Sequence, residues 1–344
     1  MTRTLVANLD YEFELLSKQS TLPKALLRRL GKTATILRVF SPQLLVTPFP
    51  IELNWFSEVK DLSVPRVIQS QTVPKGSEVM YWAQSKEPSN AICTDIDVAS
   101  YQETAWRCPR ASVVTSRRAN DKVFCHDLQK QLGIELPQSK KINHIGDIEQ
   151  LRDYPSWVIK SRYGVAGRNR LLGRYEANDT QRKALEKMIQ QSETLILEPW
   201  MTRIQDYGVT GFLTHDNIFH VRVHILKVES QGTFSGIDTK DGSIDKQIVS
   251  VLTEAFGQIA DALQKGNYIG PLGIDAFTYR GTDGRIHLHP VTEINARMTF
   301  GHVAHAYSEV FARPIELGFG ESVPNEATII SAPSDSDSTN CWIV

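Results

Sequence analysis

Residues 270–304 read GPLGIDAFTYRGTDGRIHLHPVTEINARMTFGHVA, and this stretch decides the fold. It predicts two antiparallel strands joined by a short turn, with Asp275 on the first strand and Glu293, Asn295 and Arg297 on the second. Because residues two apart on a strand point to the same face, the last three side chains form one row. Carboxylate and amide oxygens in such a row suit Mg²⁺, and the neighbouring guanidinium suits a phosphate or an oxyanion.

The turn of this hairpin decides whether Asp275 shares the face of that row. Residues 282–284, TDG, predict a three-residue loop with Gly284 in the left-handed conformation. Such a loop places Asp275 opposite Val291 and diagonal to Glu293, within reach of a shared ion. A two-residue turn would place Asp275 on the other face. The alternative interpretation of the whole row is a solvated polar face on an antiparallel hairpin.

The bulk composition excludes several classes of protein. The 344 residues contain 38 Lys plus Arg against 39 Asp plus Glu, so no excess charge favours nucleic acid or an anionic membrane as a partner. No apolar run approaches the roughly 20 residues that span a bilayer, and the charged N-terminus is unlike a signal peptide. The four cysteines lack metal-like spacing, which predicts a reduced, cytoplasmic protein.

Apolar runs alternate with helix-like segments along the chain, which predicts a mixed α/β fold. We expect a smaller N-terminal α/β domain at residues 1–110, a larger two-lobed domain at 111–320 and a flexible polar tail at 321–344. The candidate strands of the first domain are residues 4–9, 34–39 and 78–83.

Periodicity predicts more elements in the larger domain. The expected helices are residues 123–132, 178–191, 245–265 and 302–312. The expected strands are residues 157–160, 171–172 and 194–198, followed by a meander at 207–227. Gly133 and Gly266 stand where the first and third of these helices are expected to end.

Four separated features follow one another in this region. The strand WVIK ends in Lys160 and opens a loop that contains Gly164 and Gly167. The segment LILEPWM carries Glu198, and Asp206 follows in DYGVTGF. The hairpin completes the series.

In this order and at these separations, residues 120–305 resemble the ATP-grasp superfamily. The resemblance implies that ATP is held between two α+β lobes, with residues 1–110 as a preceding domain. Members of the superfamily mostly join a carboxylate to an amine through an acyl phosphate, which releases ADP and phosphate. Transfer of the γ-phosphoryl group to a carboxylate depends mainly on positioning and charge neutralisation.

The resemblance also implies roles for individual residues. Asp275, Glu293 and Asn295 would hold Mg²⁺, or Mn²⁺ in its place, and Arg297 would stabilise the charge that develops on the substrate oxygen. Arg222 is a further catalytic candidate if the polar face of the strand NIFHVRVHIL lines the cleft. If that face meets solvent, Arg222 is an ordinary surface residue.

The residues implied to bind the nucleotide are Lys122, Lys160, Gly164, Gly167, Arg168, Glu198, Trp200, Met201 and Asp206. Alternatives stay open for several of them. A lysine at a strand end is often solvated, and the glycines would also serve a turn that needs positive φ. Pro199 removes one amide donor from the expected adenine linker, and an aspartate such as Asp206 is common in turns.

The leading functional hypothesis is an ATP-dependent carboxylate–amine ligase that acts on an amino acid, a peptide or a similar small metabolite. The partners would be small-molecule carboxylate and amine substrates, without nucleic acid or membrane, and a homodimer is compatible with this reading. A second hypothesis is a nucleotide-binding regulatory or scaffold protein without turnover. A third is an enzyme that stops at phosphoryl transfer, since that step needs the same metal site.

Overall fold

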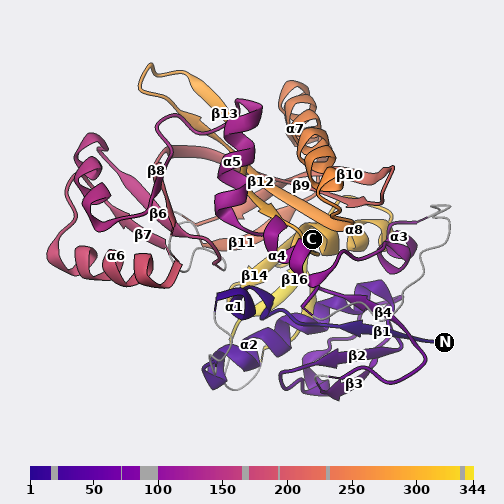
Figure 1. Ribbon diagram of the computed structural model, residues 1–344. Helices are drawn as coiled ribbons and strands as arrows, with labels where there is room; N and C mark the ends of the chain where they lie inside the picture. Colours follow the sequence, from indigo (N-terminus) through magenta and orange to yellow (C-terminus); the bar gives the residue numbers. More distant parts are fainter. Residues whose placement is uncertain are drawn as a thin grey trace.

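The structure is a computed structural model that describes residues 1–344 except 17–21, 71, 86–99, 165–169, 193, 230–232 and 334–337. The described chain forms three sheets with helices packed around them (Figure 1). The predictions for Gly167 and Arg168 lie outside the described residues. No helix in the described part has the length and apolar character needed to cross a membrane.

The N-terminal unit contains a four-stranded parallel sheet in the order β3-β2-β1-β4. Its strands are β1 (Thr2–Val6), β2 (Leu44–Thr47), β3 (Arg66–Gln69) and β4 (Ser77–Tyr81). The helices are α1 (Tyr11–Leu16), α2 (Lys24–Ala34) and the 3₁₀ helices η1 (Thr35–Phe40) and η2 (Leu53–Trp55).

The strand predicted at residues 34–39 is wrong, because η1 occupies this position. All six residues of η1 are buried, and a short, continuously buried run does not reveal by periodicity whether it is helical or extended. The strands predicted at residues 4–9 and 78–83 correspond to β1 and β4.

A small antiparallel sheet in the order β5-β8-β6-β7 forms a separate lobe, which lies at the left of Figure 1. Its strands are β5 (Lys140–Ile142), β6 (Trp157–Ser161), β7 (Arg170–Gly173) and β8 (Leu195–Pro199). The helices η3 (Ile145–Asp153) and α6 (Asp179–Ser192) pack with it around a core that includes Trp157, Leu185 and Leu197.

The largest sheet has eight antiparallel strands in the order β13-β12-β9-β10-β11-β14-β16-β15. Its strands are β9 (Thr202–Leu213), β10 (Ile218–Val228), β11 (Phe234–Asp238), β12 (Gly270–Arg280), β13 (Ile286–Asn295), β14 (Glu316–Gly320), β15 (Thr328–Ser331) and β16 (Asn340–Ile343). The 3₁₀ helix η4 (Asp241–Ser243) follows β11. The predicted meander corresponds to β9 and β10.

Helices α7 (Lys246–Lys265) and α8 (Phe300–Val310) cover this sheet. The apolar face of α7 buries Leu252, Phe256 and Ile259 in one core with strand residues. By contrast, α8 packs into the core that it shares with the N-terminal unit, where Tyr307 donates a hydrogen bond to the Ile36 carbonyl at 2.9 Å. The large sheet and the N-terminal unit therefore share one core.

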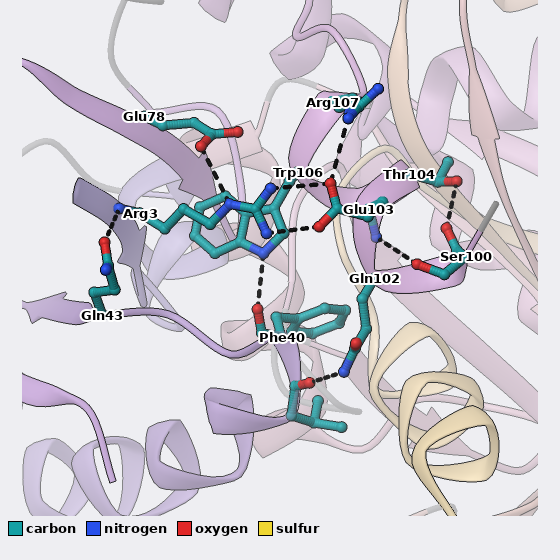
Figure 2. A network of polar contacts seen from close by, with 11 residues as sticks. Arg3, Phe40, Gln43, Glu78, Ser100, Gln102, Glu103, Thr104, Trp106 and Arg107 are labelled. Carbon is teal, nitrogen blue, oxygen red and sulfur yellow. Dashed lines mark hydrogen bonds and ion pairs between the residues drawn. The ribbon is translucent and has the colours of Figure 1, made fainter. Parts of the chain in front are cut away.

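A polar network joins the N-terminal sheet to helix α3 (Tyr101–Arg107), as Figure 2 shows. Arg3 of β1 contacts Glu78 of β4 at 3.2 Å and holds both oxygens of Glu103 at 2.6 and 2.9 Å. Trp106 donates to the Phe40 carbonyl at 2.7 Å. Because a forked arginine–carboxylate pair fixes orientation, the network holds α3 against the N-terminal sheet.

The hairpin turn has the predicted form. Gly281 donates to the Arg285 carbonyl at 2.9 Å, which leaves residues 282–284 as the loop, and Gly284 has a φ of 76°. Arg280 pairs with Ile286 as the loop requires. The three-residue loop and its left-handed glycine are therefore confirmed.

The register changes farther along the hairpin. Phe277 pairs with His289, but Asp275 then pairs with Glu293 and not with Val291, because a bulge adds residues to β13 between the two pairs. Pro290 lies in this interval, and a residue without an amide hydrogen is tolerated at a bulge on an edge strand. The shift is even, so Asp275 keeps its face while Val291 lies in the core.

The flexible tail expected at residues 321–344 is not what the described part of this segment forms. β15 and β16 close the large sheet, and all four residues of β16 are buried. Ile343 is 1% exposed in the core that also contains α8. The polar composition of the segment misleads because a few apolar residues, Ile330 and residues 341–343, carry its packing.

Candidate active site

A cavity of about 660 Å³ lies where the three parts of the molecule meet. Helices α1 and α2 line it from the N-terminal unit, β6 and β7 from the small lobe, and β9, β10, β12 and β13 from the large sheet. Twelve of the site residues proposed from the sequence are described. Eight of them line this cavity: Lys122, Lys160, Gly164, Asp206, Asp275, Glu293, Asn295 and Arg297.

Two carboxylates face each other at one end of the cavity. The pairing of β12 with β13 sets Asp275 opposite Glu293, and Gly273 opposite Asn295. Burial, and after it the neighbouring carboxylate of Glu293, raise the pKa of Asp275 to about 7, while Arg297 opposes the shift. Two like charges in a buried site favour a proton or a cation between them.

The chemistry of this donor set fits a magnesium ion. Within the described residues, no three histidine, cysteine, aspartate or glutamate side chains gather as ligands. The donors on β12 and β13 are the carboxylates of Asp275 and Glu293 and the side-chain amide of Asn295. Mg²⁺ is commonly held by one or two carboxylates together with substrate phosphates, so the set is sufficient when a nucleotide completes the coordination.

Lys122 places a cation beside this row. It is the first residue of α5 (Lys122–Leu132), and its Nζ lies 2.7 Å from Oε1 of Glu293. Burial lowers the pKa of Lys122, but the Glu293 carboxylate outweighs burial and the net shift is upward. Asp121 caps the helix by accepting from the Val123 amide at 2.9 Å.

Asn120, directly before that cap, ties α5 to the hairpin. Its side chain accepts from the Ala296 amide at 3.0 Å and donates to the Ala296 carbonyl at 3.2 Å. The end of β13 is thereby fixed against the start of α5. This connection explains how a helix residue and a strand residue 171 positions apart come within hydrogen-bond distance.

A second lysine–carboxylate pair comes from the small lobe. Lys160 near the end of β6 places its Nζ 2.6 Å from Oε2 of Glu198 on β8, and Glu198 is only 6% exposed. Burial raises the pKa of Glu198, but Lys160 outweighs it and the net shift is downward. Strand pairing of Val158 with Glu198 sets up this contact.

Arg297 follows β13 and is held from three sides. Its guanidinium contacts Glu12 of α1, donates to the Asn295 side chain at 3.1 Å and donates to the Met298 carbonyl at 3.0 Å. Its Nε is buried without a hydrogen-bond partner. Glu12 keeps the pKa of Arg297 raised against the effect of burial.

Three solved structures resemble this one over nearly the whole chain. The N5-carboxyaminoimidazole synthetase from Staphylococcus aureus complexed with ADP is 13% identical, with a TM-score of 0.58 over 100% of this chain and 92% of that chain. The biotin carboxylase–β-γ-ATP complex from Campylobacter jejuni is 12% identical, with a TM-score of 0.59 over 100% and 87%.

The third is the N5-carboxyaminoimidazole ribonucleotide synthetase from Thermus thermophilus, 11% identical, with a TM-score of 0.55 over 99% and 92%. These structures belong to ATP-grasp enzymes. The chain has the ATP-grasp fold. No protein-family description and no curated protein matches its sequence. The mixed α/β class and the fold expected from the sequence are therefore confirmed.

In this ATP-grasp fold, the adenine linker expected at residues 198–201 lies beside the cavity. The side chains of these four residues do not line the cavity. The Trp200 amide donates to the Ser156 carbonyl at 2.9 Å, and the Trp200 ring faces Arg170 and Arg203 at 5.4 and 5.5 Å. Met201 packs on the cluster of Leu136, Phe277 and Tyr279. The proposal of adenine contacts here rests on the backbone of Glu198 and Met201.

Asp206 lies on β9 and not in a turn. It lines the cavity and forms an ion pair with Arg203. Burial raises the pKa of Asp206, and Arg203 offsets only part of that shift. Arg203, which the sequence did not single out, thereby adds a cation to the lining of the cavity.

Arg222 does not reach the cavity, so its expected place in the cleft is wrong. It is exposed on β10, whereas His224, two residues on, is 2% exposed and lines the cavity. Both residues lie on the same face of β10, in regular pairing with β9, and α8 covers this face only at His224, where Nε2 of His305 lies 3.3 Å from Nδ1 of His224. Burial lowers the pKa of His224 to about 3, so this imidazole is neutral at physiological pH.

Glu12 was also missed from the sequence. It lies in the short helix α1, far from any motif, and meets Arg297 only because α1 packs against the end of β13. A glutamate in an acidic first turn is typical of a solvated helix N-terminus, so the sequence carries no signal for this contact.

Proposed function

We propose that this chain is an ATP-dependent ligase that activates a small carboxylate as an acyl phosphate and joins it to an amine, releasing ADP and phosphate. One observation carries the proposal. A single cavity in an ATP-grasp fold collects two lysines, an opposed pair of carboxylates and a buried arginine.

The lysines are set up to bind phosphate oxygens. Lys122 and Lys160 each hold one carboxylate, at 2.7 and 2.6 Å. An ammonium group has three donors, so each lysine retains capacity for a phosphate oxygen while its partner fixes its position. Such preorganised charge favours phosphoryl transfer, which depends mostly on positioning.

The acidic row and Arg297 would act on the reacting groups. Mg²⁺ held by Asp275, Glu293 and Asn295 would neutralise charge on the β- and γ-phosphates. Arg297 would bind the substrate carboxylate, in place of Glu12 or beside it, and keep its oxygen near the γ-phosphoryl group. The amine then attacks the acyl carbon and phosphate leaves, with the proton of the amine passing to a base or to solvent.

Water must be kept from the acyl phosphate, since its attack would turn ligation into ATP hydrolysis. The cavity is bordered by three parts of the molecule and by buried side chains of β9 and β12. This arrangement supports ligation over a scaffold role.

The test is nucleotide turnover with Mg·ATP and a panel of carboxylates and amines, singly and in pairs. We expect ADP and phosphate to be released, with the fastest release for one acid–amine pair. AMP and pyrophosphate would instead indicate an adenylating enzyme. If calorimetry with Mg²⁺ shows that neither ATP nor ADP binds, the proposal fails, and a binding protein without turnover would bind ATP but release no ADP with any pair.

A further inference from the structure

Four aromatic rings form a continuous surface on one side of the cavity. Trp82, Phe234, Phe300 and Phe319 all line it, and we refer to these four residues as the aromatic wall. Phe300 lies 5.3 Å from Trp82, 5.7 Å from Phe234 and 5.2 Å from Phe319, measured between ring centroids. Phe234 and Phe300 are stacked, with 11° between their planes.

The wall is assembled from four separate elements. Trp82 directly follows β4, Phe234 is on β11, Phe300 begins α8 and Phe319 is on β14. The three phenylalanines are only half-buried, although they pack on the core shared by the N-terminal unit and α8. Ring surface is therefore left facing the cavity.

Aliphatic side chains line the cavity beside the aromatic wall, and the polar residues Arg29, Lys32 and Asn340 line it as well. Leu26 and Leu30 of α2 line it from the N-terminal unit, and Leu226 and Val228 of β10 line it from the sheet. All four are half-buried. Apolar surface in a ligand pocket favours an apolar group of the occupant, while polar groups fix the orientation of that occupant.

The wall adjoins the candidate carboxylate site. Phe300 is three residues beyond Arg297, and the Met298 amide between them donates to the Trp82 carbonyl at 2.9 Å. Arg297 and the wall are thus connected through neighbouring backbone and line the same cavity. A carboxylate held by the arginine has the wall as its neighbour.

We propose that the carboxylate substrate carries a bulky apolar group, aromatic or branched aliphatic, that packs on the aromatic wall. This inference rests on the proposed ligase function and adds the substrate class. Small or charged acids would leave the wall covered only by water. All candidate acids share the reacting carboxylate, so the fit of the apolar group to the wall determines which acid binds more tightly.

The test compares 3-phenylpropionate with propionate, which share the carboxylate and differ by the ring. Calorimetry is done on the full chain with saturating Mg·ADP. We expect 3-phenylpropionate to bind at least about tenfold more tightly, because burial of a ring is worth more than one factor of ten in affinity. Equal affinities, or no binding of either acid to the ADP-bound protein, would overturn the inference.

Two variants assign the effect to the wall. Val228→Phe fills the space beside the aromatic wall, and Phe319→Ala removes one ring of the wall. Each variant is expected to lower the affinity for 3-phenylpropionate about tenfold and to leave the affinity for propionate unchanged. Val251→Phe makes the same change as the first variant on the exposed face of α7, and it should change neither affinity. Thermal melts identify a variant that fails to fold, in which case the other variant decides.

The two proposals fail in different ways. Loss of ADP and ATP binding in the wild type removes the ligase function. Preserved nucleotide binding, together with ADP release stimulated by small polar acids but not by apolar ones, removes only the substrate class.

Discussion

Asp275 of β12 lies directly opposite Glu293 of β13, and the bulge that contains Pro290 produces this opposition. Without the bulge, the partner of Asp275 would be Val291, which instead lies in the core. Bringing the two carboxylates together therefore destabilises the metal-free protein by repulsion between like charges, and burial increases this repulsion. Such stored repulsion is typical of a site that a cation completes.

The first prediction concerns the stability of the metal-free protein. Because burial and Glu293 raise the pKa of Asp275 to about 7, the folded state keeps a proton that the unfolded state loses near pH 4. The free energy of unfolding should therefore fall as pH rises from about 4 to 7 and then level off. Asp275→Asn should remove this slope and stabilise the metal-free protein at pH 8 by roughly 2–4 kcal/mol.

Urea unfolding in EDTA at pH 5, 6, 7 and 8 measures this effect. Asp216→Asn, at an exposed turn position, is the matched control and should keep the wild-type profile. An Asp275→Asn profile that runs parallel to the wild type would contradict the raised pKa.

The second prediction concerns turnover. Glu293→Gln keeps an oxygen for Lys122 but removes the charge opposite Asp275, so the two effects on stability oppose each other and should leave a net change within about 1 kcal/mol. Loss of a metal ligand in phosphoryl transfer should lower kcat about a thousandfold or more. Steady-state ADP release with the active acid–amine pair measures this.

Glu254→Gln, on the exposed face of α7, serves as the control for turnover. Excess Mg²⁺ or Mn²⁺ should restore part of the activity of Glu293→Gln, because concentration offsets weaker ligation. Wild-type turnover in Glu293→Gln would remove this residue from the mechanism.

The third prediction concerns the buried pair of Lys160 and Glu198. Lys160→Met leaves the Glu198 carboxylate 6% exposed and without its cation, and should cost about 3–5 kcal/mol at pH 7. Lys160→Met combined with Glu198→Leu should recover most of that loss, because no buried charge remains. Chemical denaturation of both variants and of Glu198→Leu gives the coupling energy.

The pair also has a pH signature. Lys160 holds the pKa of Glu198 below its usual value, so the stabilisation is present above the unfolded pKa and is lost as pH falls through the folded value. The wild type should therefore lose stability in acid more steeply than the double variant. If the free energy of unfolding falls equally steeply in acid for the wild type and the double variant, the pair contributes nothing to stability.

The fourth prediction concerns the C-terminal strands. Ile343→Ala on β16 should cost about 2–5 kcal/mol, because this side chain is 1% exposed in the shared core. Ile329→Ala on the neighbouring β15 is the control, since Ile329 is 36% exposed and should lose about 1 kcal/mol or less. Similar small losses of stability in both variants would indicate that residues 321–344 form the flexible tail expected from their composition.

The sequence by itself determined the local elements. The hairpin loop follows from Gly284, which accepts a positive φ without strain, and the helices α5 and α7 follow from apolar periodicity and a glycine after each helix. The shared face of Glu293 and Asn295 needed only the two-residue period of a strand, whereas Arg297 lies beyond the end of β13. The ATP-grasp fold was recognisable because its motifs lie on such elements, in a fixed order.

Tertiary structure alone decided which groups meet. Arg222 and His224 share one face of β10, and the strand period does not show where along that face the cover ends, so Arg222 lies in solvent while His224 lines the cavity. The contact of Glu12 with Arg297 joins residues 285 positions apart. Such contacts depend on how all the packed faces fit together, since no local period or turn encodes the distance between separate elements.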